Sequence, residues 1–435
     1  PGNIPDGCTY PPRWPLADEQ CVREDPNFDE VEDEHETACF HWEDAEEAIP
    51  FADVDEYGTQ ESIEGSQSED PVVSLDDVEV HFEDGGGLLD IFDEPETVYA
   101  VDGIDLDIYE NDVVALVGES GCGKTTLGKT AIGAQRPTDG TVSFQGQDIW
   151  AAKDKSDDVD IPWGDVRRSL QIIHQDPGSA LNPNRTVLAT LSEPLRRWEP
   201  DMNQDDRRER ILGMLEHVGM TPARDYANRY PHQLSGGEKQ RVALIRALLM
   251  NPDLILADEA VSALDVSLRV EMMDLMHELQ DLFDTSYLFI SHNLSNARYF
   301  AGKVDGRIGV MYLGELVEIG PVDQVINDPR HPYTKVLLWS TADLDMEEEA
   351  EEPPIRGIDI PDPEDPPSGC RFHTRCPEAR EACREQTPGL GEGAVADHGV
   401  ACFREYGEDH PYWDSEPLAD DEADSSEPAL SGTSD

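Results

Sequence analysis

The chain has 435 residues, with 95 acidic and 32 basic side chains and a net charge of −63. This length suits two or three domains. So acidic a surface repels itself in dilute salt, and we therefore expect a halophilic protein from a salt-rich cytoplasm. The sequence has no basic patch, which argues against nucleic acid as a partner, and no run of about 18 apolar residues, which argues against a membrane-spanning helix.

The first 42 residues repeat the pattern of a segment near the other end of the chain. The matching positions are Cys8, Trp14, Cys21 and Cys39 in the first copy, and Cys370, Cys376, Cys383 and Cys402 in the second. Four cysteines grouped in one short segment favour a metal or cluster site over a disulfide framework. Pro1 is not an initiator residue, so we expect the chain to be a processed product or part of a longer one.

An acidic stretch over residues 43–70 predicts a linker. Alternating apolar residues then predict strands from Val72 to Phe82 and from Val98 to Ile108. Since these early strands precede strand–helix units, we expect an α/β fold with a mixed sheet.

The next strand, Val113–Val117, runs into the loop Gly118–Thr126, with the sequence GESGCGKTT, and then into a helix expected over residues 127–134. This order of strand, glycine loop and helix is that of a phosphate-binding loop. Glycines leave backbone N–H groups free to surround a phosphate, and the helix start adds partial positive charge. Lys124 can reach the β- and γ-phosphates, and the Thr125 hydroxyl can hold Mg²⁺. A chance glycine-rich turn is the alternative, and the complete motif argues against it.

A further strand ends just before Gln175. This position would lie at the carboxyl edge of an open α/β sheet, where ligands bind. From this stretch alone, a surface glutamine in a turn is an equal alternative. Residues 178–230 carry helical periodicity, which predicts a helical insertion between the two halves of the sheet.

Ser235, Gly236 and Gly237 begin another helix, which continues to Met250. Such a helix start offers free backbone N–H groups to a second phosphate. Ser235 and Glu238 also have the spacing of a capping box, and the two roles are compatible.

Two later apolar strands end in polar side chains. The first leads to Asp258, which we expect to hold Mg²⁺ through water, and Glu259, which we expect to polarise an attacking water. A solvated acidic strand end is the alternative. The second leads to His292, which would reach the same sheet edge and contact the γ-phosphate, although a lone histidine is more often structural.

Taken together, these motifs resemble the ATP-binding cassette (ABC) ATPases over residues 72–340. The resemblance implies an ABC-type nucleotide-binding domain, with a P-loop core, a mixed β-sheet and a helical subdomain. It implies phosphate binding by Gly118, Ser120, Gly121, Cys122, Gly123, Lys124, Thr125 and Thr126; Mg²⁺ binding by Thr125, Gln175 and Asp258; a signature of Ser235, Gly236 and Gly237; a D-loop at Asp265; and catalysis by Glu259, His292, Gln175 and Lys124. It also implies an aromatic platform for adenine, for which Phe82 is the first choice and Tyr99 the second.

The match departs from the family in two places. Ala260 and Val261 stand where Pro-Thr is usual, and Asn293 stands where Asp is frequent. Neither change removes a group that hydrolysis needs, so we expect a competent site.

Further motifs resemble the ATPase subunits of oligopeptide and dipeptide importers. They are Gln175–Pro177 followed by Ala180–Pro183, then Asn327–Thr334, and the tail from Ile360 to Cys402. In some members this tail resembles a segment that binds a [4Fe-4S] cluster, which would make Cys370, Cys376, Cys383 and Cys402 its ligands. Zinc on the same thiolates, or four unmetallated thiols, are the alternatives. The other implied cofactors are ATP and Mg²⁺.

The resemblance divides the chain into six expected parts. They are a remnant of a Cys-containing tail from a preceding cassette (1–42), an acidic linker (43–70), the ABC ATPase domain (71–341, with a helical subdomain at about 176–233), a second acidic linker (342–354), a C-terminal Cys domain (355–405) and a disordered acidic tail (406–435). Because a tail follows an ATPase domain, we expect the chain to be the second half of a tandem fusion.

The implied function is ATP hydrolysis that powers a di- or oligopeptide importer from the cytoplasmic face of the cell membrane. The expected partners are a second ABC ATPase, two membrane permease subunits and an extracytoplasmic substrate-binding protein. Closure of the ATPase pair would be transmitted to the permease through the Gln175 loop and the helical insertion. Sugar or nickel cargo is one alternative, and a soluble ATPase without a transport role is another. The stretch between the phosphate loop and Ser235 lacks sustained heptads, which argues against DNA-repair relatives.

Overall fold

The computed structural model describes residues 19–23, 26, 29–32, 35–41, 70–83, 97–156, 159–341, 354–357, 359–391 and 398–418. The chain divides into two compact units, Pro1–Gly65 and Ser66–Asp435. In the first unit, helix α1 (Glu19–Arg23) precedes an antiparallel pair, β1 (Asp29–Glu32) and β2 (His35–Thr37). Cys8 and Trp14 lie outside the described residues, as does nearly all of the predicted linker at 43–70, so the expected tail remnant stays a prediction.

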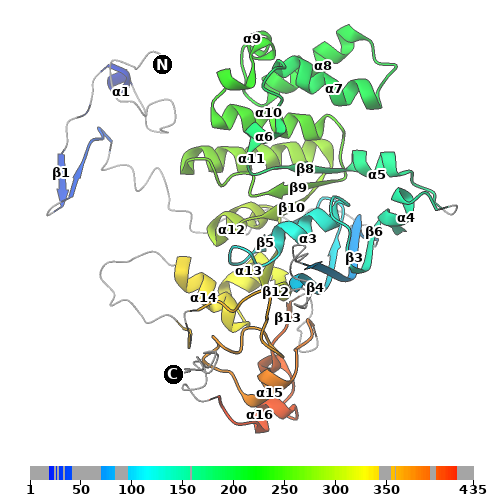
Figure 1. The fold of residues 1–435 in the computed structure, drawn as a ribbon. Helices are drawn as coiled ribbons and strands as arrows, with labels where there is room; N and C mark the ends of the chain where they lie inside the picture. The colour runs from blue at the N-terminus through cyan, green and yellow to red at the C-terminus, as the bar shows by residue number, and fades with distance from the viewer. Residues whose placement is uncertain are drawn as a thin grey trace, which may run out of the picture. The chain divides into compact units, whose positions relative to one another are not determined.

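A seven-stranded sheet forms the centre of the second unit, in the order β13-β12-β11-β5-β10-β9-β8 (Figure 1). Its strands are β5 (Val113–Val117), β8 (Leu170–Ile173), β9 (Leu254–Asp258), β10 (Ser286–Ile290), β11 (Arg307–Tyr312), β12 (Glu315–Pro321) and β13 (Gly399–Val400). The five strands from β11 to β8 run parallel, β12 is antiparallel to its neighbour β11, and β13 is antiparallel to β12. Every residue of β5, β9 and β10 is buried, which explains why these strands are apolar apart from Asp258 and Ser286 at their ends. The expected mixed sheet is confirmed.

A second, antiparallel sheet has the strand order β4-β3-β6-β7. Its strands are β3 (Val73–Glu83), β4 (Thr97–Ile108), β6 (Asp139–Phe144) and β7 (Gln147–Asp148). Helix α3 (Lys124–Ala131) begins three residues before the predicted start, and its Leu127 shares one apolar core with both sheets. Helix α3, which follows the phosphate loop, is therefore packed against both sheets.

A group of helices lies above the central sheet in Figure 1. They are α6 (Pro177–Ala180), α7 (Val187–Trp198), α8 (Gln204–His217), α9 (Ala223–Asn228) and α10 (Gly236–Leu248), and α11 (Val266–Phe283) lies beneath them. Thr186 and Asn203 cap α7 and α8 with their side chains, and Leu191 and Ile211 are fully buried between these helices. The helical insertion predicted from periodicity is therefore present.

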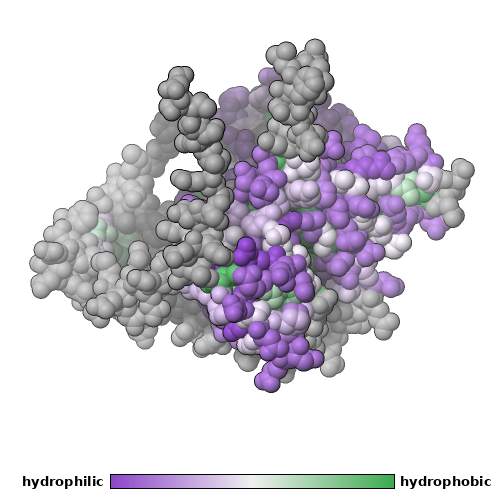
Figure 2. Space-filling view, turned by 60° about the horizontal axis from the view of Figure 1, so that its bottom comes forward, coloured by the Kyte–Doolittle hydropathy of each residue, from purple (hydrophilic) through white to green (hydrophobic). Residues whose placement is uncertain are grey.

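The remaining helices of the ATPase part are α4 (Ile149–Lys153), α5 (Trp163–Ser169), α12 (Leu294–Gly302), α13 (Val322–Asn327) and α14 (Pro332–Thr341). None of the helices that the structure describes is long and apolar enough to span a bilayer. The face shown in Figure 2 is mostly hydrophilic where residues are coloured, as the acidic composition leads one to expect.

The C-terminal extension packs on the far side of the sheet from the helical group (Figure 1). It contains α15 (Glu381–Glu385), the edge strand β13, a 3₁₀ turn at Phe403–Glu405 and α16 (Pro411–Asp414). Our prediction of a disordered tail from residue 406 was wrong for residues 406–418. Tyr412 is buried there, and its hydroxyl donates to the Glu378 carbonyl at 2.9 Å. The prediction failed because it was based on the acidic composition of this stretch and gave no weight to its few aromatic residues. Residues 419–435 and most of the linker at 342–354 lie outside the described ranges.

Candidate functional site

The phosphate loop follows the buried strand β5 and leads into α3. Gly118 has φ 149° and Gly123 has φ 102°, in the region that favours glycine. A Cβ on Gly123 would lie 2.0 Å from the Ala100 carbonyl oxygen, so no larger residue fits. Of the other predicted loop residues, Ser120 and Gly121 are exposed on the loop, and Cys122 is buried beneath it. Burial raises the pKa of the Cys122 thiol.

Lys124 and Thr125, at the start of α3, bond to different parts of this site. The Lys124 Nζ donates to the carbonyl oxygens of Gly118 and Glu119, at 2.8 Å each, so its ammonium group lies inside the loop. The Thr125 hydroxyl donates to Asp258 Oδ1 at 2.8 Å. The structure therefore brings together two of the three side chains predicted to hold Mg²⁺, from α3 and from the end of β9, whereas the third, Gln175, donates to Glu259. Thr126 follows them in the first turn of α3.

Glu259 lies at the meeting point of three strand ends. Its Oε2 accepts a hydrogen bond from Gln175 Nε2 at 2.8 Å, and its Oε1 is 3.4 Å from His292 Nδ1. Its backbone has φ 49°, an uncommon conformation for a residue with a side chain, and its N–H donates to the Ile290 carbonyl. Gln175, Glu259 and His292 follow β8, β9 and β10, so parallel register explains why they meet.

The residues predicted as signature and D-loop lie elsewhere. Ser235 caps α10, where its hydroxyl accepts from the Glu238 N–H, and the predicted capping box is present. Helix α10, which begins with Gly236 and Gly237, packs against α6, α7 and α11. Asp265 caps α11 by accepting from the Leu268 N–H at 3.0 Å. Within the described part of this chain, these contacts do not include the phosphate loop.

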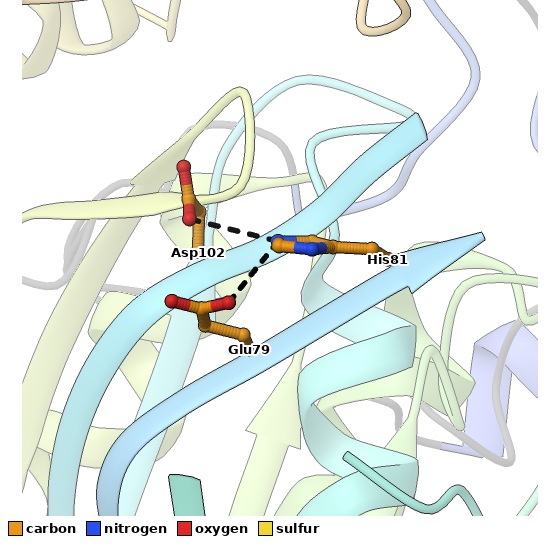
Figure 3. Close-up of side chains that lie close together, drawn as sticks. All are labelled: Glu79, His81 and Asp102. Atoms are coloured by element: carbon orange, nitrogen blue, oxygen red, sulfur yellow. Dashed lines mark ion pairs between the residues drawn. The ribbon is translucent and has the colours of Figure 1, made fainter. Parts of the chain in front are cut away.

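Phe82 lies at the end of β3 with 43% of its surface exposed, so its ring is available for stacking. Beside it, His81 lies edge-on to Tyr99, with 4.6 Å between ring centroids. Figure 3 shows His81 pointing between two carboxylates: its Nε2 is 3.6 Å from Glu79 Oε2 and 3.7 Å from Asp102 Oδ1. This cluster joins β3 to β4 beside Phe82.

The four C-terminal cysteines are free thiols that line one small cavity of about 20 Å³. They are Cys370, Cys376, Cys383 and Cys402. Burial raises the pKa of Cys376 and of Cys402 to about 12. Over the described ranges, only the His81 cluster brings three metal-ligating atoms within 4.8 Å of one another, so no three of these sulfurs are that close.

A groove of about 460 Å³ lies beside the strand that leads to Gln175. It is bounded by α5, β8, α7 and α10, and it is lined by Arg167, Arg197 and Arg246 together with His174. The linear sequence has no basic run, yet the fold gathers these cations from three helices. Glu193 lines the same groove, so its charge is mixed, and the expectation that nucleic acid is not a partner stays a prediction.

Two contacts of the site were not foreseen. Glu119, within the phosphate loop, is bound by Arg375 and Tyr333, which come from the C-terminal part of the chain. Asp102 of the His81 cluster is bound by Arg371. The only signal in the sequence is that both arginines lie between the first two cysteines of the tail.

The comparisons with known proteins agree with this geometry. Residues 101–262 match the family model described as ABC transporter, and residues 317–383 match the model described as oligopeptide/dipeptide transporter, C-terminal region. The oligopeptide transport ATP-binding protein OppF of Salmonella typhimurium is 40% identical over 335 residues, which cover 77% of this chain and 96% of that protein. The chain belongs to the ABC transporter ATPases.

Other relatives of this ABC ATPase have similar names. The oligopeptide transport ATP-binding protein AppF of Bacillus subtilis is 39% identical over 337 residues, covering 77% of this chain and 98% of that protein. The dipeptide transport ATP-binding protein DppF of Haemophilus influenzae is 39% identical over 313 residues, covering 72% and 91%. As expected from its motifs, the chain is an ATPase that uses ATP and Mg²⁺ and works with a second ATPase and membrane permease subunits.

Proposed function

We propose that this ABC ATPase powers the import of oligopeptides or dipeptides, from the cytoplasmic face of a membrane and with an extracytoplasmic substrate-binding protein. Peptide cargo is supported by the names of OppF, AppF and DppF and by the match of residues 317–383 to a C-terminal region of peptide transporters. Sugar or nickel cargo is the alternative that the sequence left open.

The observation that carries the mechanism is the position of Glu259 between Gln175 and His292. In the proposed reaction, Glu259 polarises the attacking water, and Gln175 and His292 hold that carboxylate and the γ-phosphate in place. Thr125 and Asp258, now hydrogen-bonded to each other, would hold Mg²⁺. When bound, this ion neutralises charge on the phosphates.

Lys124 would turn from the loop carbonyls to the β- and γ-phosphates when ATP binds. Phe82 would stack on adenine, since its ring is exposed next to the loop-bearing sheet. Each residue contributes position and charge, which is how phosphoryl transfer is mostly catalysed.

The signature residues would act on a second ATPase. Ser235, Gly236 and Gly237 form a helix start, which offers free N–H groups and partial positive charge to a γ-phosphate. Since their contacts in this chain lie within the helical group, the proposed phosphate is that of the opposing cassette. Asp265, which caps α11, would lie at the same junction.

The groove lined by Arg167, Arg197 and Arg246 would receive a cytoplasmic helix of a permease subunit. It is large enough for a few side chains, and the strand along it, β8, leads directly to Gln175. A helix seated there would move with the Gln175 loop, so the groove connects transport to the hydrolytic site.

The four cysteines of the tail would hold a [4Fe-4S] cluster. They fit the donor set of such a cluster, since four free thiols line one cavity. One tetrahedral zinc ion needs its four sulfurs within about 3.8 Å of one another, given Zn–S bonds of about 2.3 Å. Among the described residues no three of these sulfurs lie within 4.8 Å of one another, so zinc on the same thiolates stays the alternative to be tested by metal analysis.

Transport by the reconstituted complex tests the proposed cargo. The chain, its partner ATPase, the permease subunits and the binding protein are placed in liposomes, in high salt on both sides. Uptake of a labelled tripeptide into the liposomes is compared with uptake of a disaccharide and of Ni²⁺. In each case ATP is enclosed in the lumen of the liposomes, on the side of the ATPase subunits. ATP-driven peptide uptake is expected. Uptake of only the sugar or nickel would contradict peptide cargo and leave the ATPase standing.

A further inference from the structure

Glu119 is unusual among the loop residues because all three of its polar groups are engaged. Its backbone N–H donates to the Tyr333 hydroxyl at 2.8 Å, and its carbonyl accepts from Lys124 Nζ at 2.8 Å. Its carboxylate accepts from Arg375 Nη1, at 3.1 Å to Oε1 and 3.0 Å to Oε2. The position of this residue, and with it the loop between Gly118 and Ser120, is therefore set from outside the loop.

The groups that hold Glu119 stand on a rigid base. Tyr333, at the start of α14, is fully buried against Tyr312 and Phe372, with ring centroids 4.6 and 5.4 Å away. Phe372 is itself buried and lies three residues before Arg375, whose side chain is also almost fully buried. This aromatic packing leaves the guanidinium little freedom to leave the loop.

The segment from Cys370 to Cys376 has a second anchor on the nucleotide-binding sheet. Arg371 donates to Asp102 Oδ2 on β4 and to the Leu313 carbonyl, and its Nε is 3.2 Å from Glu315 Oε1. Two arginines in one short segment thus bind strand β4 and the phosphate loop. These contacts attach the segment to the nucleotide-binding sheet on one side and to the phosphate loop on the other.

The charge of Arg375 also matters for the ligand. Glu119 places a carboxylate in the loop that wraps a triphosphate, and like charges at short range disfavour binding. A buried arginine on that carboxylate cancels the charge where solvent screens it least. Without the arginine, the loop would carry an uncompensated negative charge and lose one of its three anchors.

We propose that Arg375 is a positioning residue for ATP, which acts through Glu119 to hold the phosphate loop open and to neutralise it. In this view the Cys-containing extension is part of the nucleotide-binding machinery of its own chain. The proposal concerns ATP binding alone and does not depend on the cargo or on the metal content of the extension.

Equilibrium binding of Mg-ATP and of Mg-ADP to the full-length chain tests the proposal, with Glu259→Gln as the background so that ATP is not consumed. One charge-assisted hydrogen-bond pair changes an equilibrium by about tenfold, so Arg375→Met should raise Kd for both nucleotides about tenfold. Arg375→Lys keeps the charge but not the guanidinium whose Nη1 donates to both carboxylate oxygens, and it should give an intermediate Kd. The matched control is Arg404→Met, which removes another arginine of the extension that binds Glu378 at 2.8 Å, and it should leave Kd unchanged.

A second-site change separates positioning from a general loss of structure. Glu119→Gln removes the charge that Arg375 compensates, so adding it to the Arg375→Met chain should recover the part of the affinity lost to the uncompensated charge, while the part lost with the anchor stays lost. A merely structural arginine would show no such recovery. Wild-type Kd in Arg375→Met, or an equal loss in Arg404→Met, would overturn the proposal; so would failure of Glu119→Gln to recover binding in the double variant.

Discussion

The buried imidazole of His331 should make the stability of the protein fall as the pH is lowered. The residue is 1% exposed at the start of α14, where its N–H donates to Glu318 and its Nδ1 accepts from the Tyr333 N–H. Burial lowers its pKa to about 4, from an ordinary value of 6.5. Between these values the unfolded chain binds a proton that the folded chain does not. Stability is therefore fully present above about pH 6.5 and is lost as the pH falls toward 4.

The size of this loss follows from the shift. A difference of about 2.5 pKa units corresponds to about 3 kcal/mol in full, of which about 2 kcal/mol is lost between pH 7 and pH 5. Replacing the imidazole by an amide in His331→Gln removes this titration. The free energy of unfolding of the variant should therefore fall less steeply with pH than that of the wild type.

Denaturant unfolding at several pH values in constant high salt measures the two slopes. The comparison does not require equal stability at pH 7, since only the change with pH matters. His217→Gln is the matched control, because His217 is partly exposed on α8 and pairs with Glu278 at the surface. Parallel curves for wild type and His331→Gln would refute the assignment of a buried, neutral imidazole.

Three further predictions concern the loop, the extension and the surface. Gly123→Ala should abolish ATP binding, measured by equilibrium binding, since its Cβ would overlap the Ala100 carbonyl oxygen; binding at wild-type affinity would contradict the loop geometry. Metal analysis after anaerobic purification should give about four iron atoms for the four cysteines of the C-terminal extension, and Cys376→Ser should lower the iron content. One zinc ion per chain would contradict the cluster. Raising KCl from 0.1 to 1 M should raise the unfolding temperature, because the Debye length falls from about 10 to about 3 Å and screens the charge of −63; an unchanged or lower temperature would contradict this.

The sequence was sufficient to predict those parts of the site that local sequence patterns encode. The glycines and Lys124 form a contiguous motif whose chemistry requires that spacing. Gln175, Glu259 and His292 are far apart in the chain, but each follows a buried strand, and parallel strands bring their ends to one edge. The meeting of these three side chains was therefore predictable once the strands were recognised.

The role of the extension was not predictable in this way. The bond from Arg375 to Glu119 spans 256 positions and depends on the packing of aromatic rings, which no periodic pattern records. Strand β13 is only two residues long, too short to be recognised before its pairing with β12 is seen. The folding of residues 406–418 likewise rests on single buried side chains such as Tyr412 within an acidic stretch.

In the proposed mechanism, Glu259 is the group that activates the water that attacks ATP. The most direct test of this role is ATP hydrolysis by the reconstituted transporter with Glu259→Gln, beside ATP binding by the same variant and the surface control Glu278→Gln. The amide keeps the shape of the side chain but cannot accept the proton, so hydrolysis should fall by about 10²–10⁴-fold while ATP still binds and the control stays active. Hydrolysis by Glu259→Gln at the wild-type rate would contradict this role of Glu259.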